Sequence, residues 1–131
     1  MNELRHECLL VVEDDASLRV ALERVLRKHG YGAVLTSSLR EAIRGWRRHR
    51  ASIRVAIVDL GLGAEDGLEL IRHLHRRSPT TAIIVYSAET GPAARRELER
   101  LGVREVIAKP AAPECLVNAI RRSLDRPFGS A

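Results

Sequence analysis

Five short apolar runs alternate with longer segments of helical periodicity, and this alternation restricts the fold more than any other feature. The runs lie at 8–12, 33–35, 55–58, 82–86 and 103–107, and Arg104 and Glu105 interrupt the last of them. The first four runs are continuously apolar, which is typical of strands that are buried on both faces of a parallel sheet. The sequence therefore predicts five strands, of which the fifth is the weakest.

Between the runs, apolar residues recur at steps of three and four, as Leu18, Leu22 and Leu26 do before Gly30. Residues that begin or end helices flank the five helical segments: Gly30, Ser38 with Glu41, Asp66 with Glu69, Pro79, Pro92, Gly102 and Pro113. Strands and helices in this order form a parallel sheet with helices on both faces, joined by right-handed crossovers. We expect a doubly wound α/β fold with five strands and five helices.

The length of 131 residues and the hydrophobic content of 45% fit one domain with a substantial core. We expect this domain to span residues 1–131, with its core at about 8–125, a short polar N-terminus and a frayed tail from Arg126. No apolar run reaches the roughly 18 residues of a membrane span. The N-terminus is too polar for a signal peptide, and Cys8 and Cys115 lack metal or redox spacing. These features predict a cytoplasmic protein that is not bound to a membrane.

The chain carries a formal net charge of +5, with 22 Lys and Arg against 17 Asp and Glu. Direct binding of nucleic acid also needs a binding element and stacking groups, and an aromatic content of 3% provides no stacking platform. Two groups of arginines are typical of solvated faces, although docking of an acidic partner on the first group and contact with a partner protein on the second stay open alternatives. They are Arg40, Arg44, Arg47, Arg48 and Arg50 around Trp46, which we expect to be a partly buried helix anchor, and Arg95, Arg96, Arg100 and Arg104.

Polar residues follow four of the apolar runs at the point where each run ends. Glu13, Asp14 and Asp15 follow the first run, Asp59 the third, Ser87 the fourth and Lys109 the fifth. Ligands of doubly wound sheets bind beyond the carboxyl ends of the strands. We therefore expect these side chains to converge at one edge of the sheet.

Several carboxylates at one edge repel one another unless they take up protons or hold a cation. Oxygen ligands without a cysteine or a paired histidine favour a hard ion such as Mg²⁺. A divalent ion, the Lys109 ammonium and the Ser87 hydroxyl around a carboxylate suit the oxygens of a phosphoryl group in transfer. Asp59 would be the nucleophile, because carboxylates form aspartyl-phosphate intermediates.

These motifs together resemble the receiver domain of bacterial two-component response regulators. The resemblance is carried by 9–15 (LLVVEDD), 58–60 (VDL), 66–67 (DG), 85–88 (VYSA) and 109–110 (KP), and it covers about residues 8–125. It implies a flavodoxin-like fold with strand order 2-1-3-4-5. It also implies transfer of a phosphoryl group from the phosphohistidine of a sensor histidine kinase, or from a phosphotransfer protein, to an aspartate.

The resemblance assigns a role to each matching position. Asp59 is the phosphoacceptor, and Glu13 and Asp14 are the acidic pair, with Asp14 a direct Mg²⁺ ligand. Asp59 and the backbone carbonyl of Gly61 complete the metal site. Lys109 pairs with the phosphoryl oxygens. The readout positions are Ser87 as the switch hydroxyl, Ala88 as the small residue beside it, Val106, and Pro110 after a cis peptide bond.

Three positions depart from the family pattern. Gly63 stands where the family usually has proline, and the greater freedom of glycine predicts a more mobile loop. Val106 stands where a tyrosine or phenylalanine commonly couples the switch to the output face, and Ala111 replaces a common phenylalanine. The expected chemistry is therefore intact, whereas the readout differs from the usual one.

The resemblance implies a phosphoacceptor that catalyses its own phosphorylation and slow dephosphorylation but is not an enzyme in the turnover sense. Its partners would be the kinase, a downstream protein or a C-terminal output domain, and a second copy of the chain. The main alternative is a pseudo-receiver, which binds protein constitutively without phosphorylation. An aspartyl phosphatase is disfavoured because Gly61 occupies the position of the second carboxylate that such enzymes need.

Overall fold

The computed structural model describes residues 8–125, so the expectations for the N-terminus and for the tail from Arg126 lie outside the described residues. The elements are β1 (Cys8–Val12), α1 (Ala16–Lys28), β2 (Gly32–Thr36), α2 (Leu39–His49), β3 (Ile53–Val58), β4 (Gly61–Leu62), β5 (Glu65–Asp66), α3 (Gly67–Arg77), β6 (Ala82–Ser87), α4 (Pro92–Arg100), β7 (Glu105–Ala108) and α5 (Pro113–Asp125). The predicted alternation is confirmed. The last long strand begins two residues later than the run 103–107 predicted, at Glu105.

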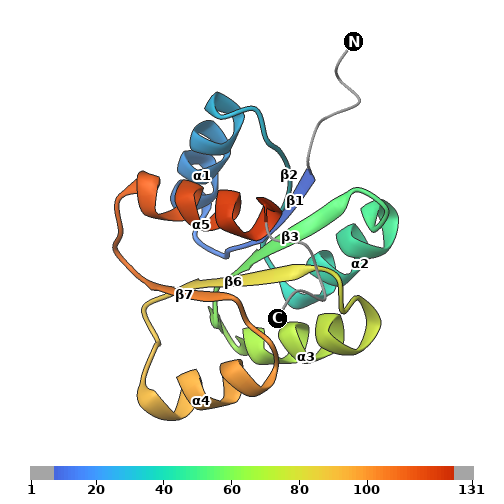
Figure 1. Cartoon of the computed structure of the whole chain (residues 1–131), viewed down its shortest axis with the longest axis vertical. Coiled ribbons are helices and arrows are strands. Elements are labelled where there is room, and N and C mark those ends of the chain that lie inside the picture. The colour runs from blue at the N-terminus through green and yellow to red at the C-terminus, as the bar shows by residue number, and fades with distance from the viewer. Residues whose placement is uncertain (1–7, 126–131) are drawn as a thin grey trace.

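The five long strands form one parallel sheet in the order β2-β1-β3-β6-β7. Counted among the long strands alone, this is the expected order 2-1-3-4-5. Figure 1 shows α1 and α5 on one face of the sheet and α2, α3 and α4 on the other. The molecule is therefore a doubly wound α/β fold, as the sequence predicts. Within residues 8–125, no helix combines the length and the hydropathy needed to cross a membrane.

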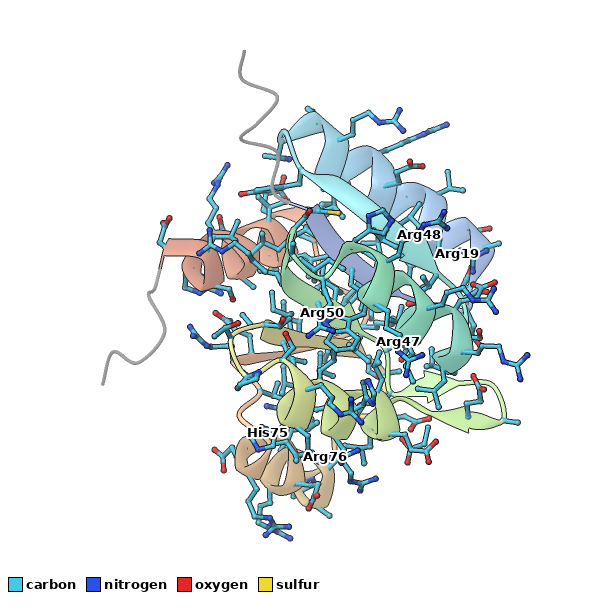
Figure 2. The ribbon with its side chains drawn as sticks, turned by 90° about the vertical axis from the view of Figure 1, so that its right-hand side faces the viewer. Arg19, Arg47, Arg48, Arg50, His75 and Arg76 are labelled. Atoms are coloured by element: carbon cyan, nitrogen blue, oxygen red, sulfur yellow. The ribbon has the colours of Figure 1, made fainter. Side chains whose placement is uncertain are left out.

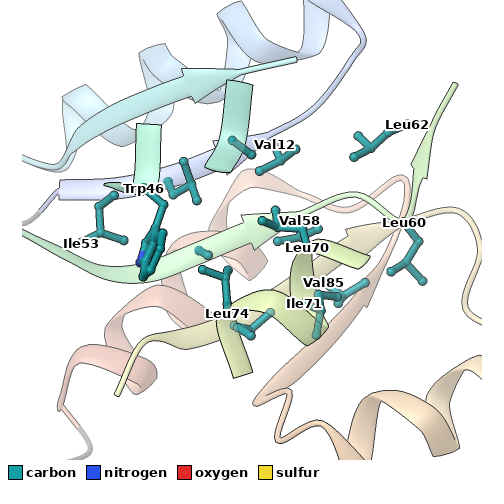
Figure 3. Close-up of a cluster of buried hydrophobic side chains, with 14 of the residues drawn as sticks. Val12, Trp46, Ile53, Val58, Leu60, Leu62, Leu70, Ile71, Leu74 and Val85 are labelled. Carbon is teal, nitrogen blue, oxygen red and sulfur yellow. The ribbon is translucent and has the colours of Figure 1, made fainter. Parts of the chain in front are cut away.

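Two hydrophobic clusters lie on the two faces of the sheet because successive residues of a strand point to opposite sides. In β1, Leu10 and Val12 face the α2–α3 cluster, and Leu9 and Val11 face the α1–α5 cluster. Figure 3 shows the first cluster, in which β1, β3 and β6 pack against α2 and α3. All four of these β1 side chains are at most 1% exposed.

The continuous apolar runs mark the central strands better than the edge strands. The central strands β1, β3 and β6 are almost entirely buried, whereas β2 and β7 at the edges are half-buried. An edge strand has a neighbour on one side only, so less of its surface is covered. This position explains why the fifth run carries two charged residues.

Trp46 of α2 is buried rather than partly buried, so that expectation is wrong. The side chain is 2% exposed and lies in the α2–α3 cluster, and the ring of His73 from α3 packs against it edge to face at 5.3 Å. The Arg50 guanidinium covers the indole ring at 4.9 Å. Helix α3 and Arg50 thus exclude water from a residue that helical periodicity alone leaves at the boundary.

A short antiparallel hairpin, β4–β5, follows β3 and was not predicted from the sequence. Gly61 pairs with Asp66 and Leu62 with Glu65, which leaves Gly63 and Ala64 as the two turn residues. Gly63 has φ +67°, a backbone conformation that proline cannot adopt. A positive φ at the first turn position is typical of tight two-residue hairpins. Gly63 therefore gives the segment after the predicted phosphoacceptor a definite turn.

Candidate functional site

The acidic residues lie one position beyond the ends of β1 and β3, at the same edge of the sheet. The N–H of Glu13 donates to the carbonyl of Thr36 at 3.0 Å, and the N–H of Asp59 donates to the carbonyl of Val12 at 3.1 Å. The strand ladder therefore continues through both acids and holds their backbones side by side. Glu13 is 2% exposed and Asp59 is 6% exposed.

Lys109 reaches this edge from the end of β7 and bridges the two acids. Its Nζ lies 2.7 Å from Glu13 Oε1 and 3.0 Å from Asp59 Oδ2. The N–H of Lys109 donates to the carbonyl of Ser87 at 3.0 Å, and the bond from Lys109 to Pro110 is cis, as the resemblance implies. Hydrogen bonds between charged groups are stronger than neutral ones. The ammonium is thus anchored between two buried carboxylates.

The remaining carboxylate oxygens of the two buried acids also have partners. Glu13 Oε2 accepts from the N–H of Asp15 at 3.1 Å, and Asp59 Oδ1 accepts from the N–H of Gly61 at 3.1 Å. Asp14 is exposed, and its carboxylate makes no hydrogen bond or ion pair to any residue of the described chain. Asp14 therefore offers its oxygens to a ligand without losing an internal contact.

Burial and pairing act in opposite directions at this edge. Burial raises the pKa of Glu13, and the hydrogen bonds from Lys109 and the Asp15 N–H work against this rise. Burial alone would lower the pKa of Lys109, but the hydrogen bonds with Glu13 and Asp59 outweigh it and raise that pKa. Lys109 is therefore firmly protonated at neutral pH.

Glu13, Asp14 and Asp59 fit a divalent cation. Each offers one carboxylate oxygen, and these oxygens lie within 4.8 Å of one another. Three carboxylates and one ammonium leave an excess of negative charge that a divalent ion offsets. An all-oxygen donor set favours a hard cation such as Mg²⁺ or Ca²⁺. Gly61 lies at the same edge, where its N–H bonds to Asp59.

The structure places Ser87 at the carboxyl end of β6, beside β7. Ser87 is 1% exposed, and its Oγ accepts from the N–H of Glu89 at 3.2 Å. Ala88 and Pro110 are exposed, and Val106 is half-buried against the α2–α3 cluster. Ser87 and Lys109 thus meet through their backbones, while Val106 faces the side of the sheet away from α1 and α5.

Asp15, the third acid after β1, has a structural role. Its carboxylate accepts from the N–H of Leu18 at 3.2 Å and caps the N-terminus of α1. Asp66 caps α3 in the same way through the N–H of Leu68. The carboxylates of these two capping acids are not among the three that could hold a metal ion.

No role was assigned from the sequence to three residues near the edge, Gly67, Tyr86 and Glu89. A Cβ on Gly67 would overlap the carbonyl oxygen of Asp59, and a Cβ on Gly61 would meet Glu89 Oε2 at 3.2 Å. The Lys109 ammonium lies 5.5 Å from the centre of the Tyr86 ring. Gly67 and Tyr86 stand inside motifs that the resemblance rests on, but only the packed backbone shows what Gly67, Tyr86 and Glu89 approach.

The comparison with protein families finds one domain model. A model described as the response regulator receiver domain matches residues 9–121. The virulence transcriptional regulatory protein PhoP of Salmonella choleraesuis is 34% identical over 123 residues, which are 94% of this chain and 54% of PhoP. The regulatory protein VirG of Rhizobium rhizogenes is 31% identical over 120 residues, which are 91% of this chain and 49% of VirG. The chain thus spans about half the length of these relatives.

Solved structures with the same architecture cover nearly the whole chain. The chemotaxis protein CheY4 of Vibrio cholerae aligns with a TM-score of 0.83 at 26% identity, over 90% of this chain and 98% of that one. The non-phosphorylated HemR receiver domain of Leptospira biflexa aligns with a TM-score of 0.86 at 22% identity, over 95% and 98%. At such identity the HemR likeness concerns the fold.

Proposed function

Because this chain belongs to the family of response regulator receiver domains, we propose that it accepts a phosphoryl group on Asp59 in two-component signalling. The donor is the phosphohistidine of a sensor histidine kinase or of a phosphotransfer protein. The acceptance step is catalysed by the receiver itself, which also hydrolyses the product slowly. A cytoplasmic location follows from a donor of this kind.

The observation that carries the proposal is the bridge from Lys109 to Glu13 and Asp59 at 2.7 and 3.0 Å. A buried carboxylate that lies beside a fixed ammonium can accept a negatively charged phosphoryl group, because the ammonium offsets the added charge. In the transfer, an Asp59 oxygen forms the new O–P bond as the P–N bond to the donor histidine breaks. The bonding electrons return to the imidazole ring.

Mg²⁺ is the cation that we assign to the acidic cluster. Glu13, Asp14, Asp59 and the Gly61 carbonyl would hold it, with Asp14 contributing the oxygens that have no other partner. When bound, the ion supplies positive charge to the oxygens of the transferring group. Asp59 is already oriented by the N–H of Gly61, so the chain itself aims the acceptor oxygen.

The readout begins at Ser87 and Lys109. Phosphorylation draws the Lys109 ammonium from the Asp59 carboxylate to the phosphoryl oxygens, and the Ser87 hydroxyl follows by exchanging its bond with the Glu89 N–H. These moves shift an equilibrium between two surfaces of the receiver. Val106 has no ring to swing at the α2–α3 side. Tyr86 lies next to the Lys109 ammonium and packs in the α1–α5 cluster, so movement of the ammonium would act on the α1–α5 side through this ring instead.

The phosphodonor protein approaches the site along α1 and the start of α5. A groove of about 110 Å³ there is lined by apolar side chains, among them Leu18, Leu22, Tyr86 and Leu116. Val20 on α1 is the only large hydrophobic side chain of the described residues that is mostly exposed, at 51%. Since Tyr86 lines this groove and the Lys109 ammonium lies 5.5 Å from the centre of its ring, a protein seated in the groove lies beside the phosphoacceptor edge. The downstream partner is either an output domain of a longer chain or a separate protein.

The test measures intact mass after incubation with acetyl phosphate, with and without Mg²⁺. We expect a Mg²⁺-dependent gain of one phosphoryl group in the unaltered protein and in Asp125→Asn, which changes an exposed acid at the end of α5. Asp59→Asn should show no gain. Beryllofluoride replaces acetyl phosphate where turnover outruns detection, because it mimics the phosphoryl group stably. A protein that forms neither adduct is a pseudo-receiver.

A further inference from the structure

A second surface lies between α2 and α3, the two helices that precede and follow Asp59 in the chain. Two adjoining grooves of about 460 and 320 Å³ share Leu39 and Ile43 as their apolar floor. Five arginines line them: Arg40, Arg44, Arg47, Arg72 and Arg76. We call the combined surface the arginine groove. Figure 2 shows this side of the molecule, with Arg47 on α2 and Arg76 on α3.

The arginines of α2 form one line along the helix. Arg40, Arg44 and Arg47 are spaced by four and three residues, so they share a face over about 10 Å of helix. Arg72 and Arg76 repeat the spacing of four on α3, at the other side of the floor. Two rows of guanidinium groups therefore flank a shared apolar strip.

The positive charge of the groove is little compensated. Within residues 8–125, Arg40, Arg44, Arg47 and Arg76 form no salt bridge, and Arg72 reaches Glu97 only at 3.9 Å. Two acids line the groove, Glu65 and Glu69. Glu65 Oε1 is already bound by the N–H of Leu39 at 2.9 Å, at the start of α2. An acidic ligand that covers these five like charges reduces their mutual repulsion, which favours its binding.

We propose that the arginine groove binds an acidic amphipathic helix of a partner protein. An apolar face of such a helix covers Leu39 and Ile43, and its flanking carboxylates pair bidentately with the two rows of arginines. A nucleic acid backbone would match the charge but would leave the floor uncovered. Among the residues that line the grooves, His73 is the one aromatic ring, and it packs against Trp46, so the grooves have no tyrosine, tryptophan or phenylalanine on which a base could stack.

This surface does not require phosphoryl chemistry. The segment that supplies Glu65 is β5, which pairs with β4, and β4 begins two residues after Asp59, so one hairpin connects the two sites. The test of the groove is therefore made on the full chain without Mg²⁺ or a phosphodonor. The protein is then unphosphorylated in every arm, so a failure of the proposed phosphorylation leaves the outcome of this test unchanged.

The experiment measures fluorescence anisotropy of a labelled synthetic peptide against the whole protein. The peptide is an 18-residue helix-forming sequence. Its leucines stand at the spacing one, four, five and eight, which places them on one face of the helix, and glutamates occupy the other faces. A second peptide has the same composition in an order that disperses the leucines. A 20-base-pair DNA duplex is the third probe. We expect the patterned peptide to bind at least about tenfold more tightly than either of the others at physiological salt.

Matched double variants locate the binding. Arg44→Glu with Arg47→Glu should weaken the patterned peptide at least about tenfold. Arg96→Glu with Arg121→Glu makes the same charge change on α4 and α5, where both arginines are exposed, and should weaken it less than about threefold. Ile43→Ala tests the apolar floor and should reduce the difference in affinity between the patterned and the dispersed peptide. Circular dichroism melts establish that each variant is folded, and Arg44→Gln with Arg47→Gln replaces the charge-reversed pair if that pair unfolds.

Four outcomes overturn the proposal. In the first, the dispersed peptide binds as tightly as the patterned one, and in the second, the duplex binds more tightly than both peptides. In the third, the two double variants weaken binding equally. In the fourth, the patterned peptide does not bind at 500 μM protein, which corresponds to a binding free energy weaker than about 4.5 kcal/mol. The first and third outcomes mean attraction by net charge alone. The second means that the surface binds nucleic acid.

Discussion

The acidic edge, formed by Glu13, Asp14, Asp59 and Lys109, and the arginine groove between α2 and α3 concentrate charge in opposite ways. At the edge, buried Glu13 and Asp59 pair with half-buried Lys109, and the backbones of the two acids continue the strands of the sheet. In the groove, like charges stand on long exposed side chains above a floor of Leu39 and Ile43. The edge is thus organised before any ligand arrives, whereas the groove is completed only by a partner.

This difference predicts different responses to mutation. Changes at the edge should lower the stability of the folded chain, because a buried charge that loses its partner is not solvated by water and a close backbone contact leaves no room for added atoms. Changes to Arg40, Arg44, Arg47 or Arg76 in the groove should leave stability nearly unchanged and alter only binding, because exposed arginines without ion pairs contribute little to folding.

The largest effect is expected at Gly67. A methyl group there would overlap the Asp59 carbonyl and press on the Leu60 Cα, and both neighbours are backbone atoms of a buried segment. Gly67→Ala should lower the free energy of unfolding by about 3 kcal/mol, measured by urea denaturation. Gly91→Ala is the control, since a Cβ on Gly91 meets nothing within 4 Å, and it should cost about 0.5 kcal/mol or less. Equal costs would show that the edge tolerates movement of its backbone.

Lys109→Met should lower the free energy of unfolding at pH 7 by about 2 kcal/mol, because Glu13 and Asp59 then remain buried without a countercharge. The loss should shrink as the pH falls and the carboxylates take up protons. Lys28→Met changes the only other lysine, which is exposed at the end of α1, and should be close to neutral. A Lys109→Met protein as stable as Lys28→Met would mean that the bridge adds no net stability.

Mg²⁺ at 10 mM should stabilise the folded chain by on the order of 1 kcal/mol if its dissociation constant is about 1 mM. The change is measured as a rise in thermal midpoint. Asp14→Asn should abolish this rise, because its carboxylate is the one among the three acids with no internal partner. Asp125→Asn and the groove variants should retain it. A rise of the same size in Asp14→Asn would place the ion elsewhere.

Neutralising the groove should hardly affect folding. Arg44→Gln with Arg47→Gln should change the free energy of unfolding by less than about 0.5 kcal/mol in either direction. Arg122→Gln is the comparison, since Arg122 bonds both oxygens of Glu105 at 2.6 and 2.8 Å, and its loss should lower stability by more than the groove pair does. A large loss of stability in the groove pair would assign those arginines a structural role.

The smallest effect concerns His73, which lines the arginine groove. Burial, followed by the charges of Arg77, Arg76 and Arg47, lowers the pKa of His73 from its ordinary 6.5. The unfolded chain therefore takes up a proton at higher pH than the folded chain, so stability should fall as the pH drops below 6.5. His73→Gln should flatten this dependence between pH 7.5 and 5.5, and exposed His49→Gln should not. An unchanged slope in His73→Gln would mean that other groups cause it.

Some of the site follows from the sequence because strand ends can be read from it. The runs ending at Val12 and Val58 put Glu13 and Asp59 at one edge once the sheet is parallel, and Lys109 follows the last run in the same way. Ser87 is located by the same reasoning. These four residues lie at or next to the end of a strand, so local periodicity is sufficient to place them.

Other features depend on contacts between distant parts of the chain. Trp46 is buried by His73 and Arg50, the β4–β5 turn needs the positive φ of Gly63, and Gly67 touches the backbone of Asp59. Local propensity describes a residue and its near neighbours along one element. It carries no information on how closely two backbones approach, so these features were predicted wrongly or missed.

The sequence by itself determined the order of strands and helices, the doubly wound class and the edge at which acids and lysine gather, because apolar periodicity and the ends of runs are local properties. Only the tertiary structure decided that Lys109 holds Glu13 and Asp59 together and that arginines of α2 and α3 border one groove. Lys109 and Glu13 are 96 positions apart, and α2 and α3 are separated by a strand and a hairpin. Such contacts arise from the packing of whole elements.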